Sequence, residues 1–139
     1  MSGGTAGMLE PYVAGLREGR IIIPRCTACA HWDWYPHRLC AHCTSESRDW
    51  ITVSGLGVVH TWTQVERIVV PVLGLSAPYI VALIELADAP GVRIPARSRD
   101  LSRPEIGSAV RLRPIPTPAG PTTEYCSVNV DVDELPRLP

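Results

Sequence analysis

The feature that most limits the fold of this chain is a pair of cysteine motifs, Cys26-x2-Cys29 and Cys40-x2-Cys43, with ten residues between them. In each motif a tight turn brings two thiolates to the same metal ion, and two motifs supply the four ligands of a tetrahedral zinc. Four protein ligands leave no open coordination position for water or substrate. The spacing therefore predicts one structural zinc ion per chain, bound by Cys26, Cys29, Cys40 and Cys43.

Other roles for these cysteines are less consistent with the sequence. Disulfides fit a reducing compartment poorly, and four free thiols at metal-ligand spacing are less expected there than a metal site. Iron sites of this kind favour glycines after each motif, where this chain has Ala30 and Thr44. His42 lies inside the second motif and is an alternative ligand, although four sulfurs already complete the shell. His31 and His37 are expected at the surface or as hydrogen-bond donors to a thiolate.

Three aromatic residues, Trp32, Trp34 and Tyr35, lie between the two motifs. One interpretation is that their rings cover the metal site. The other is that they form a docking surface, because exposed aromatic groups at this density mark protein interfaces. The sequence leaves both interpretations open, and it makes these three residues the candidates for partner binding.

The rest of the chain divides by its hydrophobic pattern. Residues 1–7 are predicted to be disordered, a short helix follows from Leu9 to Leu16, and Ile21–Ile23 form a lead-in strand. We expect residues 1–24 to hold this tail, helix and strand, residues 25–49 the metal-binding unit, and residues 50–139 a β domain with an acidic C-terminal tail. Five short strands are predicted in the last segment, at 57–70, 79–86, 92–96, 109–115 and 124–130, and their spacing indicates a compact barrel.

Composition narrows the class of function. The net charge of -1 argues against a general nucleic-acid binder, which is normally basic. All thirteen basic residues are arginine, and they are densest between residues 91 and 113. No apolar run approaches 20 residues and no signal peptide is recognisable, so we expect a cytoplasmic protein that does not cross a membrane. Phosphate-binding loops, GxSxG and HExxH are all absent from the sequence. We therefore expect a binding and partner module rather than an enzyme that works alone.

Several segments together resemble one known family. They are Pro24-Arg25-Cys26, Pro36-His37-Arg38-Leu39-Cys40, Ser54-Gly55-x-Gly57-Val58-Val59, Thr61-Trp62-Thr63 and Pro78–Leu86. The chain resembles the acyl-CoA-associated zinc-ribbon/OB-fold proteins, long known as a domain of unknown function, from about residue 9 to residue 115. The resemblance implies a mainly β fold, in which an N-terminal helix precedes a rubredoxin-like zinc ribbon and a five-stranded OB-fold barrel. The segment after Pro116 matches the family poorly.

The resemblance also implies a function. Members of the family are accessory subunits of thiolases, of thiolase-like acyltransferases, and of aldolases that cleave CoA esters of steroid side chains. It therefore implies a hetero-oligomer with a thiolase-like enzyme subunit, in which this chain contributes to the interface and to binding an acyl-CoA ester. Arg93, Arg97 and Arg99 are candidates for the CoA phosphates, because guanidinium groups pair well with phosphate oxygens. The alternative for these residues is a solvated strand face.

Two further classes of function are compatible with parts of the sequence. The first is a nucleic-acid-binding zinc-ribbon/OB module, since both folds bind nucleic acids, but the net charge disfavours it. The second is an iron or redox carrier, which the residues after the two cysteine motifs disfavour.

Overall fold

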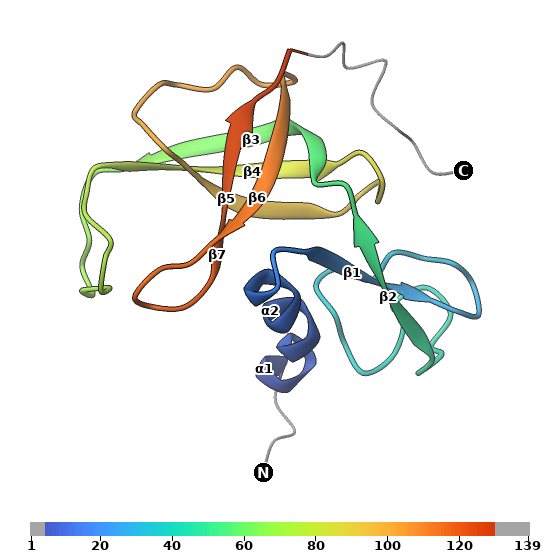
Figure 1. Ribbon diagram of the computed structural model, residues 1–139. Coiled ribbons are helices and arrows are strands. Elements are labelled where there is room, and N and C mark those ends of the chain that lie inside the picture. Colours follow the sequence, from blue (N-terminus) through green and yellow to red (C-terminus); the bar gives the residue numbers. More distant parts are fainter. Residues whose placement is uncertain (1–4, 130–139) are drawn as a thin grey trace.

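The computed structural model describes residues 5–129 and consists mainly of strands (Figure 1). Its elements are α1 (Thr5–Met8), α2 (Glu10–Arg17), β1 (Ile21–Cys26), β2 (Arg48–Val53), β3 (Leu56–Val65), β4 (Tyr79–Leu86), β5 (Arg93–Ser98), β6 (Ala109–Ile115) and β7 (Thr122–Ser127). The mainly β fold class is confirmed. The predicted disorder of residues 1–7 is wrong for residues 5–7, which belong to α1. The acidic tail that begins after residue 129 lies outside the described residues.

Five strands close into a barrel in the order β3-β4-β5-β7-β6. All neighbours are antiparallel except β5 and β7, which pair in parallel. Alternate residues of β4 point into the barrel and are buried, namely Ile80, Ala82, Ile84 and Leu86. The residues between them are half-buried, so β4 has one core face. β3 ends at Val65, and the predicted strand residues 66–70 belong to a loop.

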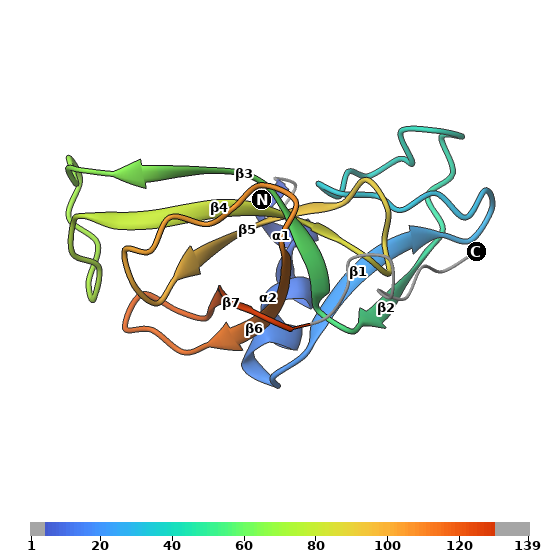
Figure 2. The ribbon, with the colours of Figure 1, turned by 90° about the horizontal axis from the view of Figure 1, so that it is seen from above.

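The first two strands form a separate antiparallel sheet beside the barrel (Figure 2). Its register runs from Ile21 opposite Val53 to Cys26 opposite Arg48. β2 therefore crosses the boundary expected between residues 49 and 50, and the barrel itself begins at Leu56. The division of the chain into domains at these exact positions stays a prediction.

One hydrophobic core joins the two sheets. Leu16 of α2, together with Ile21, Ile23 and Val53 of the small sheet, belongs to the same buried cluster as the barrel residues. Tyr12 packs against this cluster from the helix, and burial raises its pKa to about 12. Since burying apolar surface drives this packing, the helix and the small sheet are held firmly on the barrel. Neither helix in residues 5–129 is long and apolar enough to cross a membrane.

Candidate metal centre and arginine groove

The four cysteines of the two motifs meet at the end of the small sheet. Their sulfur atoms all lie within 4.8 Å of one another. The Sγ atoms of Cys26 and Cys43 are 3.6 Å apart, and those of Cys29 and Cys40 are 3.7 Å apart. A disulfide needs about 2.05 Å, whereas Zn–S bonds of about 2.3 Å in a tetrahedron separate the sulfurs by about 3.8 Å. The sulfurs thus fit a tetrahedral metal and leave it no free position, which defines a structural metal site.

The backbone of the two motifs follows one pattern. The N–H of Ala30 donates to the carbonyl of Cys26 at 3.0 Å, and the N–H of Thr44 donates to the carbonyl of Cys40 at 2.9 Å. Both donors have a left-handed backbone, with φ of 64° at Ala30 and 65° at Thr44. These are the positions where a glycine is missing from the sequence. The turns therefore form without glycine, at the cost of a strained backbone at each.

Relieving that strain gives a first test. We expect Thr44→Gly to raise the free energy of unfolding of the metal-loaded protein by about 0.5–1 kcal/mol, because glycine adopts a positive φ without steric cost. The measurement is chemical denaturation at fixed metal concentration. Ala41→Gly is the matched control, since Ala41 is exposed and has a negative φ. A gain as large for Ala41→Gly as for Thr44→Gly would rule out backbone strain as the cause.

The two histidines near the sulfurs stack on each other, and one of them donates a backbone hydrogen bond to a cysteine. The rings of His31 and His42 stack with their centroids 5.5 Å apart. The backbone N–H of His42 donates to the Sγ of Cys40 at 3.4 Å. With four sulfurs in place, the site needs no imidazole ligand.

The aromatic residues between the motifs differ in exposure. Trp32 lies under the guanidinium of Arg25, whose central carbon is 4.8 Å from the ring centroid. Trp34 packs on Tyr12 of α2 with the ring centroids 4.9 Å apart. Both tryptophans are half-buried against the core, and Tyr35 is 41% exposed. Of the three rings, Tyr35 is thus the most accessible to a partner.

A buried ion pair fixes the loop that carries these rings. Asp33 is only 3% exposed, and its Oδ2 lies 3.3 Å from Nη1 of Arg48 on β2. The other terminal nitrogen of Arg48 donates to the carbonyl of Arg38 at 2.9 Å and also to that of His37. This ion pair and the two carbonyl contacts of Arg48 link the loop to β2.

Two of the three predicted arginines line a common groove. Arg97 and Arg99 border a groove of about 330 Å³, together with the half-buried Glu124 and residues of the β3–β4 loop. Nε of Arg99 donates to Oε1 of Glu124 at 2.6 Å, and Nη2 of Arg113 donates to the same oxygen at 2.8 Å. Arg97 makes no ion pair with any residue between 5 and 129. Asp100 also lines the groove, so two arginines face two carboxylates there, and Arg97 is the lining arginine without an ion pair in the described part of the chain.

Arg93 is not part of this groove. It begins β5, at the opposite end from Arg97, and its Nε lies 3.4 Å from Oε1 of Glu85 on the neighbouring strand. Since a strand advances about 3.3 Å per residue, Arg93 and Arg97 are about 13 Å apart along β5. The sequence cluster of arginines is thus split between two places.

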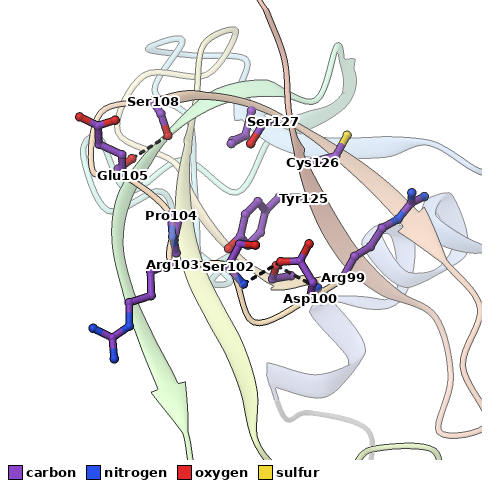
Figure 3. Close-up of a pocket in the computed structure, with 12 residues that line it drawn as sticks. Arg99, Asp100, Ser102, Arg103, Pro104, Glu105, Ser108, Tyr125, Cys126 and Ser127 are labelled. Atoms are coloured by element: carbon purple, nitrogen blue, oxygen red, sulfur yellow. Dashed lines mark hydrogen bonds between the residues drawn. The ribbon is translucent and has the colours of Figure 1, made fainter.

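A second cavity, of about 390 Å³, is lined by residues of the segment 98–100, of the β5–β6 loop and of β7 (Figure 3). The most buried polar residue of its lining is Tyr125, which is 6% exposed and whose hydroxyl has no hydrogen-bond partner within residues 5–129. Burial raises the pKa of Tyr125. Around it, the Ser102 N–H donates to Asp100 at 2.8 Å and the Ser108 hydroxyl donates to the Glu105 carbonyl at 2.6 Å, and these bonds shape the loop. Sequence reasoning missed Tyr125, because one tyrosine in an alternating strand carries no distinguishing signal.

A four-cysteine metal site on a small sheet, packed on a closed five-stranded barrel, defines a zinc-ribbon/OB-fold protein. Residues 13–47 match the family model for the ChsH2 rubredoxin-like zinc ribbon domain, and residues 50–113 match that for the ChsH2 C-terminal OB-fold domain. The chain belongs to the ChsH2 family, and the family resemblance stated from the sequence is confirmed.

Individual relatives share either part of the sequence or the fold. A "Probable enoyl-CoA hydratase alpha subunit" of Thermomonospora curvata is 33% identical over 72 residues, which are 52% of this chain. The chain spans only 22% of that relative's length. The solved Ltp2-ChsH2(DUF35) aldolase matches with a TM-score of 0.74 and 24% identity, over 86% of this chain and 93% of that one. A DUF35 protein of unknown function from Sulfolobus solfataricus matches with a TM-score of 0.54 and 16% identity, over 74% and 75%. The two structures support the fold.

Proposed function

We propose that this chain is a non-catalytic accessory subunit of a thiolase-superfamily enzyme that acts on acyl-CoA esters: a thiolase, an acyltransferase or a steroid side-chain aldolase. Membership of the ChsH2 family supports this proposal, as do relatives named as an enoyl-CoA hydratase subunit and as an aldolase complex. In the complex the chain contributes binding surface for the ester and for the enzyme subunit. The exposed ring of Tyr35 is the part of the aromatic group available for that contact.

The observation that carries the proposal is the arginine groove. Coenzyme A bears a pyrophosphate and a 3′-phosphate, which need cationic hydrogen-bond donors. Arg97 has no ion-pair partner in the described part of the chain, and Arg99 is oriented by Glu124. A guanidinium that is already oriented loses less conformational entropy when it binds a phosphate. We therefore assign the phosphates of the ester to Arg97 and Arg99.

The metal has a separate role in this proposal. Thiolate ligands, a closed tetrahedral shell and the absence of an open position all favour zinc acting as a structural ion. It holds the two cysteine turns together and takes no part in the reaction of the ester.

The double substitution Arg97→Ala with Arg99→Ala tests the ester site. We expect KM of the assembled complex for acyl-CoA to rise roughly tenfold, since two exposed charge-assisted contacts contribute about 1–2 kcal/mol. The difference from wild type should shrink as salt is added, because salt screens the attraction between guanidinium and phosphate. Steady-state kinetics at two ionic strengths measures both effects.

Arg93→Ala is the matched control, because Arg93 lies on the same strand but outside the groove. It should leave KM unchanged. The affinity between the two subunits is measured separately, so that a loss of assembly is not mistaken for a loss of ester binding. An unchanged KM for the double variant in an intact complex would place the ester elsewhere.

A further inference from the structure

The loop between β3 and β4, residues 66–78, exposes an unusual amount of aliphatic surface. Val69 is 90% exposed, Val70 73%, Val72 39% and Leu73 73%. Figures 1 and 2 both show this loop at the end of the barrel opposite the small sheet, where it caps the outer parts of β3 and β4. Contiguous exposed apolar residues at this level mark a surface that another molecule covers. We call residues 61–83, the outer strand segments with their loop, the β3–β4 arm.

The tip of the arm forms a turn that packs against the β6–β7 turn. The N–H of Leu75 donates to the carbonyl of Val72 at 3.1 Å and closes a turn. Gly74, with φ of 79°, lies so close to the β6–β7 turn that a Cβ there would be 2.8 Å from Cδ of Pro118. The valines are thus presented on an anchored turn. An anchored apolar surface loses little entropy when it binds.

One edge of β3 along the arm is open. β3 pairs with β6 only from Leu56 to Val58, and Val59 makes the last backbone bonds on that side. Its other edge continues to pair with β4 as far as Val65. Exposed strand edges are normally guarded by charges or proline, but residues 61–65 contain neither. An unguarded edge beside an apolar tip gives a partner both main-chain hydrogen bonds and hydrophobic contact.

We propose that the β3–β4 arm is a docking surface for the catalytic acyl-CoA enzyme subunit, in addition to the exposed ring of Tyr35, an inference that rests on the function proposed above. The arm is continuous with the arginine groove, because five residues of the arm form one wall of it: Gly74, Leu75, Ser76, Pro78 and Tyr79. A subunit seated on the arm therefore borders the groove as well. This arrangement places the thioester end of a CoA ester held by Arg97 and Arg99 at the boundary with the subunit that performs the chemistry.

Charge favours a protein partner over a lipid surface. Residues 68–78 carry no charge, and the flanking Glu66 and Arg67 cancel each other. Loops that insert into anionic membranes carry basic residues beside the apolar ones. This surface is therefore complementary to a protein that has an apolar groove and a free strand edge.

The test begins with the enzyme subunit that copurifies in equal amount with the wild-type chain. That subunit is identified by mass spectrometry, produced recombinantly and titrated against variants by calorimetry. We expect Val70→Ser with Leu73→Ser to weaken binding on the order of 30-fold. Ile106→Ser is the matched control, since Ile106 is an aliphatic residue 65% exposed on a different loop, and it should bind as wild type does. Hydrogen exchange of amides 61–65 should slow in the complex.

The other outcomes separate the two proposals. If an acyl-CoA enzyme binds the arm variant as tightly as wild type, the docking surface is wrong and the accessory function stands. If the stoichiometric partner is not an acyl-CoA enzyme, the accessory function is wrong and the inference falls with it. If sedimentation shows that the arm variant converts a wild-type dimer to a monomer, a second copy covers the arm and the docking proposal is overturned. Binding of the wild type, but not the variant, to phosphatidylglycerol vesicles would likewise overturn the proposal.

Discussion

Cys40→Ser is expected to abolish stoichiometric metal binding and to unfold residues 25–45. This segment has little apolar core of its own: β1 ends at Cys26, β2 begins only at Arg48, and the loop between them depends on the two cysteine turns. Binding energy at a structural thiolate site is folding energy on the order of 10 kcal/mol. Removal of one sulfur also leaves three cysteines within 4.8 Å of one another, and without the metal charge they cannot all be ionised to bind it again tightly.

The barrel should survive this substitution. Its five strands close on themselves, and most of the buried cluster lies within them. Ile21, Ile23 and Val53 contribute to that cluster from the small sheet, so a modest fall in the melting temperature of the barrel is expected. Amide exchange resolved by residue distinguishes the two units. Loss of protection should be confined to the ribbon, with residues 79–86 remaining protected.

Cys126→Ser is the control for the chemistry of the substitution. Cys126 lies on β7, with its sulfur 3.7 Å from the carbonyl of Arg111, and takes no part in the metal site. Metal analysis should therefore give about one ion per chain for the wild type and for Cys126→Ser, and almost none for Cys40→Ser. Unchanged exchange protection of residues 25–45 in Cys40→Ser would show that the metal is not structural.

The metal site was predictable because its chemistry is local. Four thiolates at this spacing have few ways to bind a metal, and all four cysteines can be identified from the sequence. Strand positions were also largely predictable, since β4 and β6 have strong alternation or apolar runs. The end of β3 was not, because residues 66–70 include a run of β-branched residues, and only their lack of a pairing partner separates them from the strand.

The interfaces were less predictable, since they depend on contacts between distant segments. The arginines at positions 93, 97 and 99 look alike in the sequence, and only the barrel register separates Arg93 from the other two. The sequence left open whether Trp34 is covered or exposed, because its partner, Tyr12, is 22 residues earlier in the chain. Conversely, the sequence predicts Val69 and Val70 to be strand residues. Their exposure could not be predicted, because it follows from β3 ending at Val65 in the structure.

Gly57→Ala is expected to be the most destabilising single-methyl change in the barrel. Gly57 lies on β3 between β4 and β6, opposite Leu86 on one side and Val110 on the other. A Cβ at this position would be 2.3 Å from the carbonyl oxygen of Glu85, about 1 Å inside van der Waals contact. That oxygen belongs to the backbone of a paired strand and cannot rotate away as a side chain would. Relief requires β3 and β4 to separate, so we expect a loss of at least about 3 kcal/mol in the free energy of unfolding.

Gly91→Ala provides the comparison that isolates this clash. Gly91 has φ of 86° and no atom within 4 Å of the position that a methyl group would take, so alanine there costs only backbone strain of about 1–2 kcal/mol. Chemical denaturation of both variants, with metal present, measures the difference directly. If Gly57→Ala loses no more free energy of unfolding than Gly91→Ala, β3 and β4 can separate enough to accept the methyl group. A larger loss of stability for Gly57→Ala would show that closure of the barrel requires a glycine in the Ser54-Gly55-x-Gly57 segment. Gly55 is similarly close to β6, because a Cβ added there would be 2.8 Å from the carbonyl oxygen of Leu112.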